Sequence, residues 1–209
     1  MLYVIAYTAC YVLGTWQCSF AIAGNGQTTN VFEAKFDWNK DDTIFYNTVI
    51  SSQGMIGLAV GSFGGGSLIK IGRRKTAIVA HIIAICASSI CMYDSVFMLS
   101  LGRFVLGISA GLANMVYGKS ITENFPEKLA SWLAMLLNAG ICCGIFVALL
   151  MGGLLPDPED KEANKSDENW RLIYAAPGII GVVELILILF IFRYEPIAYC
   201  VSKGFEEEG

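Results

Sequence analysis

The stretch Gly65-Gly-Ser-Leu-Ile-Lys-Ile-Gly72-Arg73-Arg74-Lys75 decides the fold class of this chain. It joins two apolar runs and carries four cations within one short turn. Lys and Arg concentrate in short loops on the cytoplasmic side of a bilayer. A soluble domain has no reason to place a basic hairpin between two segments that are each long enough to cross hydrocarbon. The stretch therefore predicts an integral membrane protein whose basic turn faces the cytoplasm.

Composition points the same way. Of 209 residues, 55% are hydrophobic and 15% are charged, whereas soluble domains average about 25% charged. Apolar runs of about 20 residues predict six membrane spans, at residues 2–24, 43–69, 76–92, 97–119, 129–155 and 170–192. The first run lacks the basic flank of a signal peptide, so we expect it to stay as a helix. The predicted fold class is all-α integral membrane, with six transmembrane helices arranged as two three-helix repeats.

Charged residues gather between the spans. Residues 25–42 and 156–169 are acidic loops, and they lie on the face opposite the basic turn. An even number of crossings then places both termini in the cytoplasm. The second loop contains the glycosylation sequon Asn164-Lys165-Ser166, which is usable only if that loop faces a secretory lumen. The formal net charge of −4 comes largely from these loops and gives no reason to expect a nucleic-acid partner.

Glycines recur four residues apart in three of the spans. This spacing is about one helical turn, so each set forms a smooth stripe on one helix face. Lipid tails are as apolar as leucine, so helices in a membrane associate through the close backbone contact that small residues allow. We therefore expect tight packing at three stripes, formed by Gly57, Gly61 and Gly65, by Gly107 and Gly111, and by Gly140 and Gly144.

Ionisable residues inside the spans are candidate sites, because they are costly in hydrocarbon unless paired or solvated. Arg103 and Glu184 are the main candidates, with a structural ion pair between them about as expected as a functional role. His81 fits a hydrogen-bonded packing residue better than a proton relay. Lys119 and Glu123 have the four-residue spacing of a helical ion pair.

The residues indicate no enzyme. The seven cysteines show no metal-binding or disulfide spacing, and there is no nucleophile constellation or phosphate-binding loop. We expect no metal, no cofactor and no catalytic residues. The expected partners are the lipid bilayer and a small neutral solute.

Taken together, the motifs resemble the amino-terminal half of the sugar-porter branch of the major facilitator superfamily. The resemblance covers essentially the whole chain, and the order and spacing of the motifs make it specific. The matching stretches are Leu13-Gly14-Thr15-Trp16-Gln17, Gly65-x-x-x-Ile69-Lys70-x-Gly72-Arg73-Arg74, Gly102-Arg103-x-x-x-Gly107-x-x-x-Gly111, Glu123-Asn-Phe-Pro126, Asn138-Ala-Gly140-Ile141-Cys-Cys-Gly144-Ile145, and Glu195-Pro196 with Val201-Ser202-Lys203-Gly204.

The resemblance implies a sugar site in the membrane. Asn138, Ile141 and Ile145 would contribute to it, with Gln17 nearby. Asn138 stands where the family usually has Gln, and it is one methylene shorter. In proton-coupled members a first-helix Asp pairs with the fourth-helix Arg, and Ala21 takes its place here. The resemblance therefore implies a facilitative uniporter, with a proton-coupled symporter that uses Glu184 as an alternative.

The resemblance also implies a cytoplasmic gate that stabilises the outward-open state. Its members would be Arg73, Arg74 and Glu123. Ile69 stands where the family usually has Asp or Asn, so one anion of this gate is missing.

Whole members of the family have twelve helices, with the substrate between two six-helix halves. We expect residues 1–193 to form the amino-terminal bundle and residues 194–209 to begin a cytoplasmic central loop. A second six-helix half, in the same chain or in another, would be required for alternating access. The chain would then be a piece of a longer carrier or a half that assembles. As a further alternative, it would be a structural subunit that no longer transports. The plasma membrane is the expected location, with an organellar membrane as the alternative.

Overall fold

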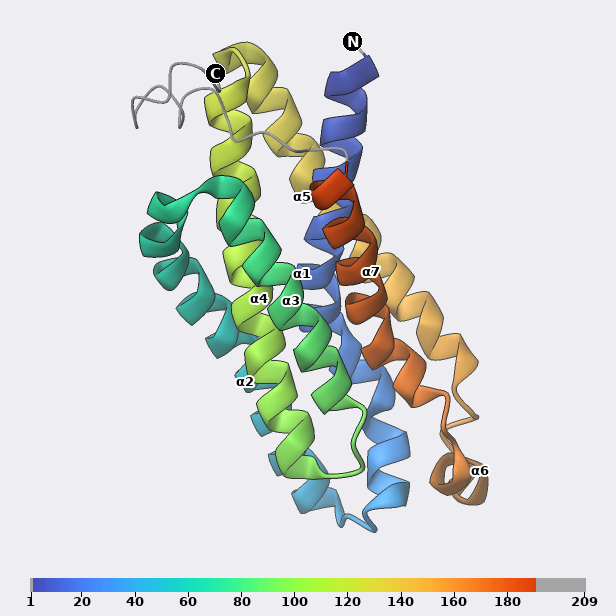
Figure 1. Ribbon diagram of the computed structural model, residues 1–209. Helices are drawn as coiled ribbons and strands as arrows, with labels where there is room; N and C mark the ends of the chain where they lie inside the picture. The colour runs from blue at the N-terminus through green and yellow to red at the C-terminus, as the bar shows by residue number, and fades with distance from the viewer. Residues whose placement is uncertain (1, 191–209) are drawn as a thin grey trace.

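The computed structural model describes residues 2–190, and side chains from residue 8 onward. Seven helices form one elongated bundle in this part of the chain (Figure 1). Their bounds are α1 Leu2–Lys35, α2 Lys40–Leu68, α3 Arg73–Cys91, α4 Val96–Asn124, α5 Glu127–Met151, α6 Lys161–Ser166 and α7 Trp170–Phe190, with 3-10 turns at Ile69–Ile71 and Gly152–Leu154. The predicted central loop and its Glu195-Pro196 motif lie outside the described residues.

Six long helices correspond to the six predicted spans. By length and composition, α2 with its 3-10 turn, α3, α4, α5 with its 3-10 turn and α7 can each cross a membrane. Helix α1 has 34 residues but is not among these five. Its polar side chains, including Thr15, Gln17, Ser19 and Thr28, are buried against other helices, where hydrogen bonds satisfy them. The last two residues of the sixth predicted span lie outside the described part of the chain.

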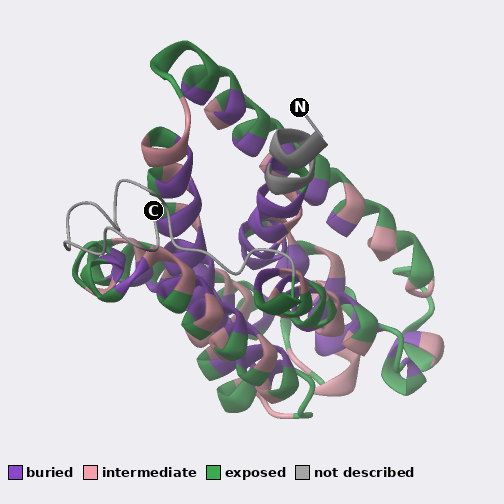
Figure 2. Ribbon diagram, turned by 45° about the horizontal axis from the view of Figure 1, so that its top comes forward, coloured by how far each residue is buried: buried purple, intermediate pink, exposed green. Residues whose placement is uncertain are grey.

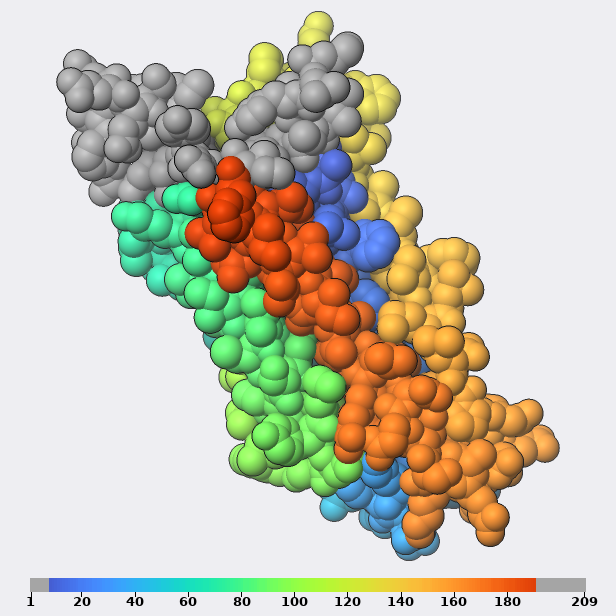
Figure 3. All heavy atoms as spheres, turned by 45° about the vertical axis from the view of Figure 1, so that its right-hand side comes forward, coloured from blue at the N-terminus to red at the C-terminus, as the bar shows by residue number. Residues whose placement is uncertain are grey.

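Helices α1 and α4 touch most of the others. Helix α4 packs on α2 and α3, while α1 packs on α5, α7 and α4. Helix α7 lies between α3 and α5 on the face that Figure 3 shows, with α1 visible beside it. Buried residues occupy the helix faces that turn toward one another, and exposed residues cover the outside (Figure 2). Many of the exposed side chains are large and apolar, which suits contact with lipid, while polar side chains such as Gln17, His81 and Glu184 are buried inside.

The first predicted loop, residues 25–42, is wrong in its extent. Helix α1 runs to Lys35 and α2 begins at Lys40, so only residues 36–39 connect the two. Polar residues that the sequence assigns to a loop are satisfied inside the bundle. The Nδ2 of Asn25 donates to the Oγ of Ser51 at 2.8 Å and to the side chain of Asn47. The Thr28 hydroxyl lies 3.1 Å from that of Tyr174.

The second predicted loop, residues 156–169, contains the short helix α6. Asp160 caps this helix, because its Oδ1 accepts the N–H of Ala163 at 3.1 Å. The Nδ2 of Asn164 donates to the carbonyls of Asp157 and Asp160, at 2.7 and 2.8 Å. The loop is therefore folded onto itself, and it packs against the end of α1.

The glycine stripes form the predicted close helix contacts. A Cβ atom added to Gly61 of α2 would lie 2.2 Å from the carbonyl oxygen of Ile108 in α4. One added to Gly107 of α4 would lie 2.2 Å from the carbonyl oxygen of Gly54 in α2. Both obstacles are backbone atoms, which cannot move aside as a flexible side chain can. The helix pair α2–α4 can approach this closely only because glycine occupies these positions.

Candidate functional site

The α2–α3 turn brings the predicted gate residues together. Gly72 has φ 142°, a conformation that favours glycine, and α3 begins at the next residue. The Nε of Arg73 donates to Oε2 of Glu123 at 2.8 Å, and its Nη2 donates to Oε1 at 2.6 Å. Such a bidentate pair is the strong form of a charge-assisted hydrogen bond. We call this pair the latch and the end of the bundle that carries it the basic end.

The four-residue spacing predicted that Lys119 pairs with Glu123, and this prediction is wrong. The Glu123 carboxylate turns instead to Arg73, whose Nη1 also donates to the carbonyl of Ile69 at 3.1 Å. Lys119 is exposed on α4. The side chain of Arg74 takes a different direction from that of Arg73. It donates from Nε and Nη2 to the carbonyl of Ile188 at 3.5 Å, near the end of α7.

Arg103 and Glu184 do not pair. Arg103 is 1% exposed, and its Nη2 donates to the carbonyl of Ala21 at 2.7 Å. Glu184 lies nearer the basic end, where its Oε2 accepts from the thiol of Cys10 at 3.3 Å and from the hydroxyl of Tyr117 at 3.5 Å. The predicted ion pair between the two is therefore wrong, because they occupy different depths of the bundle.

His81 is the hydrogen-bonded packing residue that the sequence favoured. Its Nδ1 accepts from the Nε2 of Gln17 at 2.8 Å, and its Nε2 lies 2.6 Å from the hydroxyl of Tyr117. The same Nε2 is 4.0 Å from the carboxylate of Glu184. Tyr117 connects His81 to Glu184, and no sequence pattern marks it as a site residue. An aromatic residue at helical spacing is typical of any helix core.

Gln17 lies away from the other predicted sugar-site residues. The Oε1 of its fully buried amide accepts from Ser109 at 3.2 Å, in addition to the bond with His81. These contacts belong to the side of α1 that faces α3 and α4. Helix α5 meets α1 on another side, where the Oγ of Ser19 donates to the carbonyl of Ile141 at 2.8 Å.

Asn138, Ile141 and Ile145 share one face of α5, at positions i, i+3 and i+7. Asn138 is exposed, while Ile141 and Ile145 are half-buried. The neighbouring stripe of Gly140 and Gly144 packs directly against α1. The three predicted residues therefore flank the α1–α5 contact, and Asn138 faces the outside of the described bundle.

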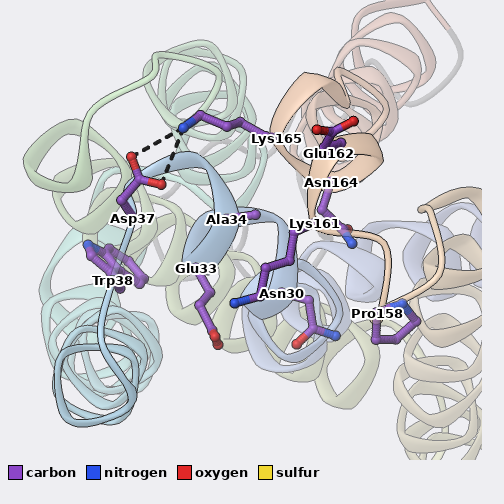
Figure 4. Close-up of a pocket in the computed structure, with 10 residues that line it drawn as sticks. All are labelled: Asn30, Glu33, Ala34, Asp37, Trp38, Pro158, Lys161, Glu162, Asn164 and Lys165. Atoms are coloured by element: carbon purple, nitrogen blue, oxygen red, sulfur yellow. Dashed lines mark hydrogen bonds and ion pairs between the residues drawn. The ribbon is translucent and has the colours of Figure 1, made fainter.

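A pocket of about 480 Å³ lies at the opposite end of the bundle, which we call the acidic end. Figure 4 shows its lining residues, which come from the end of α1 and from the loop that contains α6. Lys165 closes one side through an ion pair with Asp37 at 3.2 Å. None of the predicted sugar-site or gate residues lines it. Trp38, one of the lining residues, stacks on Phe36 and Tyr46.

Within the described residues, no group of three or more His, Cys, Asp or Glu side chains could hold a metal ion. The polar contacts inside the bundle are instead hydrogen bonds between helices. They are suited to holding helices in register.

Comparison with known proteins identifies the family. Residues 7–209 match the family described as "Sugar (and other) transporter". Hexose transporter 1 of Plasmodium knowlesi is 27% identical over 214 residues, covering 95% of this chain and 43% of the relative. The Caenorhabditis elegans proton myo-inositol cotransporter hmit-1.1 is 31% identical over 172 residues, covering 80% of this chain and 27% of the relative.

Solved structures show the same fold. The proton:xylose symporter XylE bound to 6-bromo-6-deoxy-D-glucose superposes with a TM-score of 0.84 at 19% identity, covering 99% of this chain and 48% of that one. A partially occluded, inward-open XylE from E. coli gives 0.83 at 18% identity, covering 99% and 53%. The chain thus spans half or less of the length of most of these proteins. It belongs to the sugar (and other) transporter family, and its fold is that of one six-helix half of the major facilitator superfamily.

Proposed function

We propose that this chain is the amino-terminal half of a carrier that moves a small neutral solute, a sugar, by alternating access. Membership of the family supports transport of a sugar. The coverage of 43% of the Plasmodium knowlesi relative and of 48% and 53% of the two XylE chains supports the assignment to one half. The carrier would need a second six-helix half, in the same chain or in another, to enclose its substrate. Residues 1–193 would form this bundle, and residues 194–209 would begin the loop to the second half.

The proposed sugar site is the face of α5 that carries Asn138, Ile141 and Ile145. An amide supplies a donor and an acceptor for sugar hydroxyls without adding a net charge. The two isoleucines supply an apolar surface beside it. Gln17 would join this site only by exchanging its bond to His81 or Ser109 for one to the sugar.

We propose facilitative uniport rather than proton coupling, and the contact of Arg103 with Ala21 carries this choice. The Arg103 guanidinium reaches the backbone of the residue that stands where proton-coupled members have Asp. With alanine there, Arg103 has no first-helix carboxylate whose protonation could drive a cycle. Proton-coupled symport through Glu184 is the alternative, and the names of hmit-1.1 and XylE give it support.

The latch and Arg74 would form the gate of the carrier. Broken and remade in each cycle, the Arg73–Glu123 pair would stabilise the outward-open state while the basic end is closed. The basic end and both termini would then lie in the cytoplasm, and the plasma membrane is the proposed location.

Uptake of radiolabelled hexoses and polyols by liposomes that contain the intact protein tests the proposal. We expect saturable uptake that equilibrates and does not accumulate when a proton gradient is applied. Asn138→Ala should raise the KM for uptake about tenfold, the cost of one lost hydrogen bond to the substrate. Ser131→Ala is the matched control on α5, because the Ser131 hydroxyl bonds only to its own helix. No saturable uptake of any sugar or polyol would refute transport, and accumulation driven by protons would refute uniport.

A further inference from the structure

A buried polar network joins four helices in the half of the bundle nearer the basic end. Gln17 of α1, His81 of α3, Tyr117 of α4 and Glu184 of α7 are its members, and each is 0% exposed. Tyr117 lies between the other two titratable groups, 2.6 Å from His81 and 3.5 Å from Glu184. The network does not include the α5 residues of the proposed sugar site, and Gln17 is the one member that would join that site if it exchanged a bond.

Glu184 has few partners for a buried carboxyl group. Its Oε2 accepts from Cys10 and Tyr117, while its Oε1 is buried without a hydrogen bond. The titratable groups that face Glu184 are Cys10 of α1, His81 of α3 and Tyr117 of α4. The ring of Tyr11 lies behind them, 4.5 Å from that of Tyr117. Arg74 reaches α7 only one turn further along, at the carbonyl of Ile188. Of the groups that face Glu184, His81 alone can become a cation.

The number of protons on this pair decides whether it carries an uncompensated charge. With one proton, the pair is either a carboxylic acid beside a neutral imidazole or a carboxylate beside an imidazolium. With none, a carboxylate is buried alone, and with two, an imidazolium is buried alone. An unpaired buried charge is strongly destabilising. The folded bundle therefore favours the state with one proton.

The hydrogen bonds allow that proton to sit on either residue. While the Gln17 amide donates to Nδ1 of His81, the imidazole is neutral and its Nε2–H donates to Tyr117, whose hydroxyl donates to Glu184. If the amide turns over, its oxygen accepts an Nδ1–H from an imidazolium, and its nitrogen donates to Ser109. The Ser109 hydroxyl then keeps its bond to the carbonyl of Ala80, at 2.8 Å. Both arrangements use the same partners.

We propose that His81 and Glu184 together hold one exchangeable proton through Tyr117, and that this proton locks α1, α3, α4 and α7 into a single rigid body. It regulates the proposed carrier without being carried through it, so this inference rests on the proposed function only for its effect on transport. Losing the proton, or gaining a second, loosens the four helices and slows the cycle.

Thermal unfolding of the intact protein in detergent tests the proton site without any sugar. In the unfolded chain the carboxyl titrates near pH 4.3 and the imidazole near pH 6.5, about their ordinary values. The unfolded chain therefore binds two protons in acid and none in alkali, where the folded pair still holds one. Stability should fall on both sides of a maximum between about pH 4 and about pH 7.

The variants separate the two sides of this profile. Glu184→Gln should lose the alkaline decline and keep the acid one, and His81→Gln should do the reverse. A purely structural role would lower the unfolding temperature equally at every pH. Glu127→Gln, an exposed position on α5, should leave the profile unchanged. If His81→Gln does not fold, Glu184→Gln decides alone, because an alkaline decline that persists in this isosteric variant would refute the proton site.

Sugar exchange in liposomes, with the same pH on both sides, tests the link to transport. We expect the wild-type rate to fall on both sides of its maximum, and Glu184→Gln to lose the alkaline-side fall while exchange persists. Proton influx that accompanies sugar in the wild type and disappears in Glu184→Gln would overturn regulation in favour of coupling. If no variant exchanges sugar but the unfolding profiles differ as expected, the proton site stands and the proposed function fails.

Discussion

The ion pairs at the two ends of the bundle differ in how exposed they are and in how many partners each charge has. At the basic end, the latch joins one arginine to one glutamate, whose side chains are 13% and 14% exposed. At the acidic end, four charges form a closed ring in which each cation meets each anion. The ring consists of Lys35, Asp94, Arg171 and Glu168, with its four contacts between 2.5 and 3.5 Å.

The ring is more exposed and more redundant than the latch. The anions of this ring of charges are 41% and 57% exposed. Both of its cations also lie over the indole of Trp170, at 5.3 and 5.5 Å from the indole centroid. Removing one anion leaves each cation with another partner. Removing Glu123 removes both hydrogen bonds of the bidentate pair with Arg73 at once. A single substitution can therefore break the latch, whereas each cation of the ring keeps a partner when one anion is lost.

Glu123→Gln should have the largest effect. It removes the charge that pairs with Arg73, and we expect a loss of about 1.5–3 kcal/mol in the free energy of unfolding, the typical contribution of hydrogen bonds between charged groups. Titration with SDS in mixed micelles measures this quantity. Glu127→Gln changes the same residue type at an exposed position nearby and should cost much less. Equal losses in the two variants would show that the latch contributes nothing special.

Asp94→Asn should have a smaller effect, although Asp94 contacts two cations. Lys35 and Arg171 both keep Glu168, and exposed ion pairs contribute little, so we expect a loss of about 0.5–1 kcal/mol. Glu159→Gln, an exposed residue of the same end, is the matched control. A loss as large as that of Glu123→Gln would contradict the redundancy of the ring.

Salt should sharpen the contrast between the two ends. Screening shortens the range of exposed interactions from about 10 Å at 0.1 M to about 3 Å at 1 M ionic strength, and it affects half-buried pairs less. We expect high salt to abolish most of the difference between wild type and Asp94→Asn. The difference between wild type and Glu123→Gln should largely remain. The same SDS titrations, repeated at the two salt concentrations, measure both, and equal salt sensitivity would count against the contrast.

The helices and their close contacts were predictable because their signals are local. Apolar runs give the long helices, and a four-residue glycine spacing gives the faces that meet. The extent of α1 was not predictable in this way. Asn25 and Thr28 are residue types that are typical of loops. In the folded chain their hydrogen-bond partners come from other helices, namely Asn47, Ser51 and Tyr174.

The charged pairs show the same contrast between local signals and contacts from distant parts of the chain. The four-residue spacing of Lys119 and Glu123 predicted the wrong partner, whereas the family resemblance grouped Glu123 with Arg73, 50 residues away. The pair of Arg103 and Glu184, which the structure rejects, could have been excluded by counting residues along the two helices. Arg103 lies seven residues into α4 and Glu184 lies fourteen into α7, with both helices starting at the acidic end. At 1.5 Å per residue their depths differ by about 10 Å.

The smallest expected effect concerns the glycosylation sequon at the acidic end. The acceptor atom, Nδ2 of Asn164, already donates two hydrogen bonds, and Asn164 is 2% exposed. A glycan on this nitrogen would replace one N–H and would need space that the folded loop does not leave. We therefore expect no endoglycosidase-sensitive shift on a gel when the protein is made in eukaryotic cells. Ser166→Ala removes the sequon but keeps Asn164, and the Ser166 hydroxyl bonds only within α6. This variant should migrate and unfold like the wild type. A shift that disappears in Ser166→Ala would show that the acidic end opens enough to be modified. It would contradict the expectation that redundant contacts keep this end closed.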